Sequence, residues 1–194
     1  MTLPNQLTVL RILLIPVFVL LLVYDVRIAA LIVFLLTGIS DVLDGYIART
    51  WRQQTTLGTF LDPIADKLLM VTTFATLALL QALPLSLSLL LIGRDVLLSL
   101  MIGIVLWITG RRLSGPTLWG RAAMFGQMWT VVFGLFFYVF EDWPLLTTLR
   151  PFILLPVFVV TALLAIAAGV HYFYQLVRML YQVEAPLGKR MPVQ

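Results

Sequence analysis

Apolar stretches separated by short polar segments run through almost the whole chain. Six of them reach, or nearly reach, the roughly 20 residues that a helix needs to cross a bilayer core of about 30 Å. The connections are short, and no linker or internal repeat is recognisable, which predicts a single helical domain over residues 1–194. We therefore predict an all-α polytopic membrane protein with six transmembrane helices, at about 9–24, 28–50, 60–80, 84–109, 119–140 and 151–181.

The composition agrees with this pattern and narrows the chemistry. Of the 194 residues, 61% are hydrophobic and 11% are charged, so a water-soluble domain would lack the polar surface to cover itself. The chain has no cysteine and a single histidine, His171. This excludes disulfides, thiol nucleophiles and zinc sites built from cysteine or several histidines. A metal site in this chain would therefore use oxygen ligands, and its catalytic groups would be oxygen-containing side chains.

The basic residues are unevenly distributed over the predicted loops. With six spans both termini lie on one side, and that side collects most of the Lys and Arg, whereas the opposite loops hold Arg27 and Arg150 among several acidic residues. The positive-inside rule therefore predicts that both termini face the cytoplasm, in a bacterial-type inner membrane. We interpret the net charge of +4 as attraction to anionic membrane lipids and not to nucleic acid. The first residues lack the features of a cleaved signal peptide, so we expect none.

Four aspartates interrupt the apolar pattern, Asp41 and Asp44 in the second predicted span and Asp62 and Asp66 in the third. An unpaired charge at mid-bilayer costs about 2.5 to 3.5 kcal/mol, so four of them would cost on the order of 10 kcal/mol. A divalent cation bound between the carboxylates removes that cost. The spacings i, i+3 and i, i+4 direct each pair to one side of its helix. Two such helix ends facing each other make an all-oxygen site for one or two ions of magnesium, manganese or calcium.

The aspartates belong to a longer pattern, Asp41-x2-Asp44-Gly45-x2-Ala48-Arg49-x8-Gly58-x3-Asp62-x3-Asp66. This pattern resembles the signature of the CDP-alcohol phosphotransferase family at every defined position and in both gaps. The opening Pro4-Asn5-x-Leu7-Thr8-x2-Arg11 is similar to the first-helix motif of that family. The resemblance implies six membrane helices after a short amphipathic N-terminal segment, a homodimer, and transfer of a phosphatidyl group from a CDP-linked lipid to an alcohol.

The resemblance also implies a role for each matching residue. Asp41, Asp44 and Asp62 would bind metal, two ions of Mg²⁺ or Mn²⁺, and Asp66 would share a metal and act as the general base. The donor nucleotide and diphosphate would be bound by Asn5, Thr8, Arg11, Gly45, Ala48, Arg49, Gly58 and Lys67. The small residues of this set leave room for a nucleotide beside the helix backbone, or they are packing positions between helices. The charged residues could instead form structural ion pairs.

Two further features concern the acceptor. Arg94-Asp95, and Gly120-Arg121 with Gln127, fall where bacterial phosphatidylglycerophosphate synthases of this family carry Arg-Glu and Gly-Lys-x-Lys-Thr-x2-Gln. The second Lys and the Thr are absent here, and Arg-Asp is closer to the CMP-forming cardiolipin synthases. Arg94 and Arg121 are candidates for binding the phosphate of the acceptor. Alternatively, Arg94 and Asp95 form an intramembrane ion pair that stabilises the fourth helix.

We expect phosphatidyl transfer from CDP-diacylglycerol to glycerol 3-phosphate, a small phosphorylated alcohol, with release of CMP in phospholipid biosynthesis. The alternative within the class is a CMP-forming cardiolipin synthase, for which phosphatidylglycerol is the acceptor. A function from another class is a small cation transporter whose intramembrane carboxylates line a path. Gly45 and Gly58 argue against transport, because ion ligation does not need clearance for a nucleotide.

Overall fold

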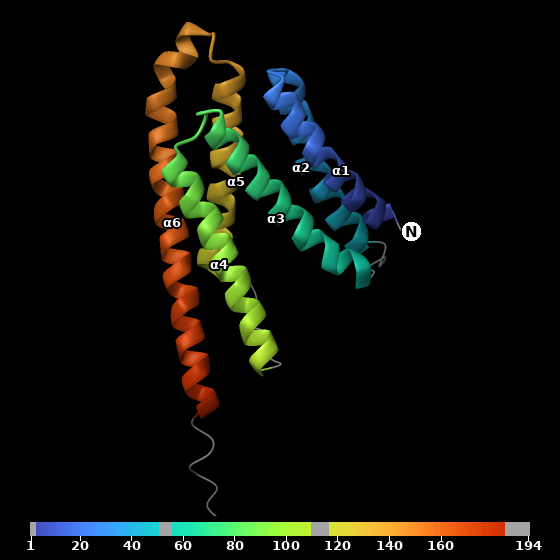
Figure 1. The fold of residues 1–194 in the computed structure, drawn as a ribbon, viewed down its shortest axis with the longest axis vertical. Helices are drawn as coiled ribbons and strands as arrows, with labels where there is room; N and C mark the ends of the chain where they lie inside the picture. The colour runs from blue at the N-terminus through green and yellow to red at the C-terminus, as the bar shows by residue number, and fades with distance from the viewer. Residues whose placement is uncertain (1–2, 51–55, 110–116, 185–194) are drawn as a thin grey trace, which may run out of the picture. The chain divides into compact units, whose positions relative to one another are not determined.

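The structure, a computed structural model, describes residues 3–50, 56–109 and 117–184, and side chains within 8–40, 64–107 and 117–178. Every regular element in these ranges is an α-helix, which confirms the predicted all-α fold (Figure 1). The helices are α1 (Leu3–Val23), α2 (Arg27–Thr50), α3 (Thr56–Leu79), α4 (Leu85–Thr109), α5 (Leu118–Val139) and α6 (Pro144–Glu184).

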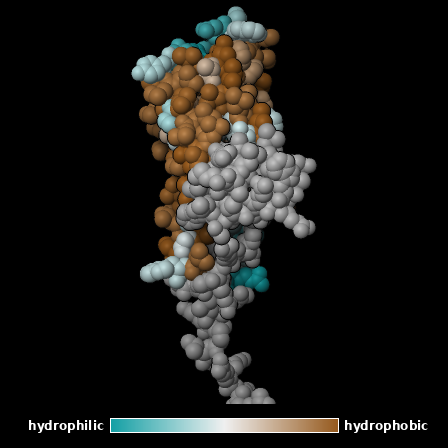
Figure 2. All heavy atoms as spheres, turned by 90° about the vertical axis from the view of Figure 1, so that its right-hand side faces the viewer, coloured by the Kyte–Doolittle hydropathy of each residue, from teal (hydrophilic) through white to brown (hydrophobic). Residues whose placement is uncertain are grey.

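Among the described residues, three helical stretches are long and apolar enough to cross a membrane: Leu85–Trp107, Leu118–Val139 and Pro144–Arg178. Shorter apolar stretches lie in α1 and α2, at Thr8–Val23 and Arg27–Ser40. In Figure 2, hydrophobic side chains predominate among those drawn in colour. Such a surface suits lipid and not water. The chain is an integral membrane protein.

The last helix begins earlier than the hydropathy pattern predicts. The pattern places a span from about residue 151, whereas α6 begins at Pro144. Proline suits the first helical position, because the N–H that it lacks would have no partner in the helix and its φ is already helical. The carbonyl oxygen of Pro144 also accepts hydrogen bonds from the hydroxyls of Thr147 and Thr148, at 2.8 and 3.0 Å. The helix therefore includes residues 144–150, which hydropathy assigns to a loop.

The described residues group into two compact units. The first combines Met1–Ser88 with Val131–Leu154, and the second combines Leu89–Thr130 with Leu155–Gln194. The helices α1, α2 and α3 therefore belong to the first unit, and α4, α5 and α6 contribute segments to both.

In the first unit, α1 packs against α2 and α3 (Figure 1). The buried residues of α1 recur every three or four positions, which is the spacing of one helix face: Thr8, Arg11, Ile15, Phe18 and Leu22. Phe18 contacts Phe34 of α2, with ring centroids 5.7 Å apart. The buried stripe is apolar toward the end of α1 and polar toward its start.

The turns after α1 and α3 share one backbone geometry. Asp25 and Gln81 have φ values of 60° and 58°, in the left-handed region that residues other than glycine rarely adopt. In the first turn Val26 N donates to Leu21 O at 2.8 Å, and the second turn repeats this hydrogen bond, as in a Schellman motif. These bonds satisfy the last carbonyl groups of each helix, which lipid would leave without a partner.

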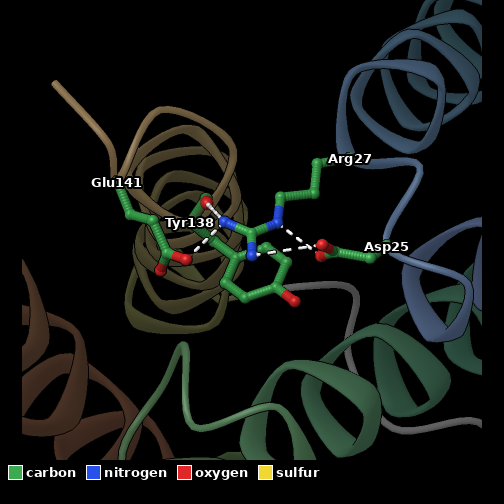
Figure 3. A network of polar contacts seen from close by, with 4 residues as sticks. All are labelled: Asp25, Arg27, Tyr138 and Glu141. Atoms are coloured by element: carbon green, nitrogen blue, oxygen red, sulfur yellow. Dashed lines mark hydrogen bonds and ion pairs between the residues drawn. The ribbon is translucent and has the colours of Figure 1, made fainter.

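Arg27 joins the first of these turns to the end of α5 (Figure 3). Its Nε donates to Asp25 Oδ1 at 2.5 Å, and its Nη1 donates to Glu141 and, at 3.2 Å, to the carbonyl oxygen of Tyr138. The guanidinium carbon also lies 4.7 Å from the centroid of the Tyr138 ring. One cation therefore connects α2, the α1–α2 turn and α5.

Arg27→Gln should lower the unfolding temperature of the protein in detergent micelles. The change removes the cation that two carboxylates share, and because both carboxylates are partly exposed, we expect a loss of about 1 to 2 kcal/mol. Asp142→Asn, at a neighbouring exposed position, is the matched control. If both variants unfold at the temperature of the parent, the network does not stabilise the fold.

In the second unit, α5 and α6 approach closely at small residues. The hydroxyl of Thr161 donates to Gly126 O at 3.0 Å and accepts a hydrogen bond from Thr130 Oγ1 at 2.9 Å. A Cβ at Gly126 would lie 3.0 Å from Thr161 Oγ1, and a Cβ at Gly120 would lie 2.6 Å from the Tyr172 hydroxyl. Glycines and buried hydroxyls at a helix crossing are typical of packing within a membrane.

Candidate active site

The four aspartates lie on helices, as their spacing predicts. Asp41 and Asp44 belong to the C-terminal half of α2, and Asp62 and Asp66 to the N-terminal half of α3. The side chains of several predicted site residues lie outside the described part of the structure: Asn5, Asp41, Asp44, Gly45, Ala48, Arg49, Gly58 and Asp62. Their predicted roles therefore stay predictions. Asp66 is the member of the carboxylate set whose surroundings are described.

Asp66 forms an ion pair with Arg11 of α1. Arg11 Nη1 donates to Asp66 Oδ1 at 2.8 Å, and the Arg11 side chain has no exposed surface, whereas 52% of the Asp66 side chain is exposed. Ala65 and Leu69 on α3 are buried, so Asp66 lies at the border of the packed face of its helix. The carboxylate thus has a buried cation on one side and remains accessible on another.

The guanidinium of Arg11 is positioned by the buried stripe of α1. Thr8 and Arg11 lie one helical turn apart at the polar end of this stripe, and 1% of each residue is exposed. A buried charge is unfavourable by several kcal/mol without an opposite charge, which Asp66 provides. The resemblance predicts that Thr8 and Arg11 approach the donor diphosphate. The structure adds that Arg11 contacts the predicted base itself.

A hard divalent cation suits this set of side chains. Carboxylate oxygens are the ligands that Mg²⁺ and Mn²⁺ prefer, and Asp66 keeps an accessible surface that a cation or a substrate can approach. No group of three or more potential ligands forms among the described residues, because the side chains of three of the four aspartates lie outside the described part. Lys67, the next predicted donor-binding residue, is exposed on α3. The metal and its stoichiometry stay predictions.

Arg94, a predicted acceptor-binding residue, lies on α4 in the second unit. Its Nη1 donates to Asp95 Oδ1 at 2.6 Å, and Gln127 Nε2 of α5 donates to Asp95 Oδ2 at 3.0 Å. Asp95 therefore uses both carboxylate oxygens, one to orient Arg94 and one to join α4 to α5. The Nε of Arg94 is buried and has no hydrogen-bond partner among the described residues. Such a donor is unfavourable when unpaired.

Arg121, the second predicted acceptor-binding residue, is exposed at the start of α5. It precedes Gln127 by six positions, which is about 9 Å along the helix axis. Asp95, which pairs with Arg94, is bonded to Gln127. The structure places the two arginines in the same unit, and their joint binding of an acceptor phosphate stays a prediction.

Tyr172 of α6 is a neighbour of Arg121 that the sequence pattern did not reveal. Its hydroxyl accepts a long hydrogen bond from Thr117 N at 3.5 Å and fills the space beside Gly120. Tyr172 therefore fixes the first turn of α5, from which Arg121 extends. Gly120 could have indicated this contact, because a glycine inside a membrane helix often marks a place where another helix packs closely. The sequence does not identify Tyr172 as the residue that packs there.

Known proteins share much of this sequence. A family model described as CDP-alcohol phosphatidyltransferase matches residues 1–143. The chain is 42% identical over 120 residues to a cardiolipin synthase (CMP-forming)/mitochondrial hydrolase fusion protein of Schizosaccharomyces pombe, and 40% identical over 116 residues to a cardiolipin synthase (CMP-forming) of Homo sapiens. It is 41% identical over 107 residues to a CDP-diacylglycerol–glycerol-3-phosphate 3-phosphatidyltransferase of Pseudomonas fluorescens.

The three alignments cover 62%, 59% and 51% of the chain, respectively. They cover 20%, 38% and 53% of the relatives. The chain therefore spans about half, or less, of the length of each of these relatives.

Proposed function

Because the chain belongs to the CDP-alcohol phosphatidyltransferase family, we propose that it is a metal-dependent phosphatidyltransferase. It transfers the phosphatidyl group of CDP-diacylglycerol to the hydroxyl of an alcohol that carries a phosphate, and CMP leaves. The observation that carries this proposal is Asp66, an accessible carboxylate held by the buried Arg11 on a helix that bears the family signature. The names of the relatives describe a CDP-diacylglycerol-dependent transferase and CMP-forming synthases.

In the proposed reaction, the acceptor hydroxyl oxygen attacks the phosphorus atom on the lipid side of the donor diphosphate. A new P–O bond forms as the bond between this phosphorus and the CMP oxygen breaks, so CMP carries the other phosphate away. Asp66 accepts the proton of the hydroxyl. Arg11, at 2.8 Å from Asp66 Oδ1, orients the carboxylate, and its buried position keeps that orientation fixed.

Asp41, Asp44, Asp62 and Asp66 would bind Mg²⁺ or Mn²⁺, with two ions as the proposed number. When bound, such a cation neutralises the charge of the diphosphate and stabilises the departing CMP. The remaining donor-binding residues follow from the family motif. The polar and basic ones are Asn5, Thr8, Arg11, Arg49 and Lys67, and the small ones that give clearance are Gly45, Ala48 and Gly58.

We further propose that the single domain crosses a bacterial-type inner membrane six times and forms a homodimer. In this arrangement both termini and the active site face the cytoplasm. It is supported by the uneven distribution of Lys and Arg over the loops and by the membrane-length stretches of α4, α5 and α6. A cation transporter gains no support from an aspartate that pairs with a buried arginine.

Two phosphate-bearing alcohols are candidates for the acceptor. Glycerol 3-phosphate, which the sequence favours, is a small dianion that would need the joint charge of Arg94 and Arg121. Phosphatidylglycerol is a monoanionic diester. The pairing of Arg94 with Asp95 at 2.6 Å favours phosphatidylglycerol as the acceptor. The carboxylate beside the arginine reduces the positive charge that a dianion such as glycerol 3-phosphate would need. On this geometry we propose phosphatidylglycerol as the better acceptor.

An acceptor competition assay tests this choice. With CDP-diacylglycerol and equal amounts of both acceptors, the parent protein should form mainly cardiolipin. Arg94→Gln should raise the KM for phosphatidylglycerol about tenfold or more, the effect of losing one charge-assisted hydrogen bond of about 1.5 to 3 kcal/mol, with little change in donor affinity. Arg121→Gln, at an exposed position, should change this KM less. Phosphatidylglycerophosphate without cardiolipin would instead identify glycerol 3-phosphate as the acceptor.

A further inference from the structure

The second unit contains an apolar groove between α4 and α6, which lie side by side there (Figure 1). Its volume is about 680 Å³, within the range of roughly 300 to 1,000 Å³ that is typical of small-molecule sites. The lining residues recur along one face of each helix, from Leu90 to Val105 on α4 and from Ala165 to Leu176 on α6. Positions 90 to 105 span about 22 Å of helix. The groove is therefore elongated, like an acyl chain.

Arg94 is the charged residue among the apolar residues that line this groove. Its side chain is 11% exposed, and its buried Nε has no hydrogen-bond partner among the described residues. Asp95 engages Nη1 through one carboxylate oxygen. A ligand that fits such a site has a long apolar part and an anionic oxygen for the guanidinium. A glycerophospholipid has both, and the two helices that form the groove are of membrane length.

We infer that the groove formed by positions 90–105 of α4 and 165–176 of α6 binds one acyl chain of an anionic glycerophospholipid. The phosphate of this lipid lies toward the Arg94 guanidinium, whose positive charge attracts it. The inference rests on the proposed function in one respect, namely that the bound lipid is the acceptor. It names the substrate class as a phospholipid with a hydroxyl-bearing headgroup, because glycerol 3-phosphate has no chain to occupy the groove.

Gly169 allows the groove to be filled without a steric clash. It lines the groove, and a Cβ at this position would meet no heavy atom within 4 Å. Gly169→Leu therefore places a branched side chain where the acyl chain would lie. Gly103 on α4 also has no heavy atom within 4 Å of its Cβ position and does not line the groove. Gly103→Leu is the matched control, because both changes raise helix propensity equally.

The test is lipid binding by the full chain in phosphatidylcholine vesicles, measured without a donor nucleotide. Phosphatidylglycerol or phosphatidylcholine with a nitroxide on one acyl chain is added in trace amounts, and the immobilised fraction is read from the electron paramagnetic resonance spectrum. The parent and Gly103→Leu should favour phosphatidylglycerol over phosphatidylcholine at least fivefold. Gly169→Leu should reduce immobilisation of both labelled lipids, and Arg94→Gln should remove the preference while leaving phosphatidylcholine unchanged.

Three results would overturn the inference. The first is Gly169→Leu with the same lipid preference and immobilised fraction as Gly103→Leu. The second is an undiminished preference in Arg94→Gln. The third is a change of oligomeric state in Gly169→Leu, which would mean that a second copy of the chain covers the groove. Because this measurement needs no turnover, an inactive protein would contradict the proposed function and still leave lipid binding readable.

Competition distinguishes the acceptor lipid from the donor lipid, which share an acyl chain and a phosphate. Unlabelled phosphatidylglycerol should displace the labelled lipid at least fivefold more effectively than unlabelled CDP-diacylglycerol. In turnover, Gly169→Leu should raise the KM for long-chain phosphatidylglycerol and spare the KM for its dihexanoyl form, whose chains are too short to fill the groove. Equal displacement by both lipids would overturn the assignment of the groove to the acceptor.

Discussion

Asp66→Asn will abolish most of the release of CMP from CDP-diacylglycerol while leaving the donor largely able to bind. An amide cannot take the proton of the acceptor hydroxyl, and loss of a positioned general base lowers kcat by about 10²- to 10⁴-fold. Because the base acts on the acceptor in the transition state, the effect should appear in kcat and not in donor affinity. The measurement is CMP release at saturating donor and acceptor, with donor affinity determined separately.

The ion pair with Arg11 calls for a control on folding. Asp66→Asn leaves a fully buried guanidinium without the carboxylate that lies 2.8 Å away, so some loss of stability accompanies the loss of the base. Asp142→Asn removes a carboxylate at an exposed position and should keep both turnover and unfolding temperature. Turnover near that of the parent in folded Asp66→Asn would assign the base to another group.

Chelation should have an effect as large as the loss of the base. If Asp41, Asp44, Asp62 and Asp66 hold divalent cations, excess EDTA removes the charge that neutralises the diphosphate and stabilises the departing CMP. CMP release should then fall to background, and added Mg²⁺ or Mn²⁺ should restore it. Ca²⁺, which accepts longer and less regular coordination, should restore it less well. Full turnover in excess EDTA would contradict a metal-dependent reaction.

The fold could be predicted from the sequence wherever it depends on local periodicity. The all-α class follows from apolar stretches of membrane length, and the helical placement of Asp62 and Asp66 follows from their spacing. The start of α6 could not be predicted from hydropathy, because Pro144 is a turn-forming residue and Thr147 is polar. The helix nevertheless begins there, with Leu146 N and Thr147 N donating to Trp143 O. Hydropathy indicates whether a residue faces lipid or water, whereas the position of a helix end also depends on local hydrogen bonds.

Contacts between helices were less predictable than contacts within one helix. Arg11 and Asp66 are 55 positions apart, and no spacing rule connects residues on different helices. The family resemblance predicted that Arg11 binds the diphosphate and that Asp66 is the general base, but the ion pair between them required the packing of α1 on α3. The surroundings of Arg94 could not be predicted for the same reason, because residues of α6 form one wall of the groove that Arg94 lines.

The most direct test of the central claim follows the lipid-side phosphorus of the donor. CDP-diacylglycerol is prepared with ³²P at that phosphorus, incubated with the purified protein, Mg²⁺ and both acceptors, and the lipid and nucleotide products are separated. Phosphatidyl transfer predicts that all transferred label stays in a new phospholipid and that an equal amount of unlabelled CMP is formed. Label in the nucleotide fraction, or an intact donor with a folded protein, would contradict phosphatidyl transfer.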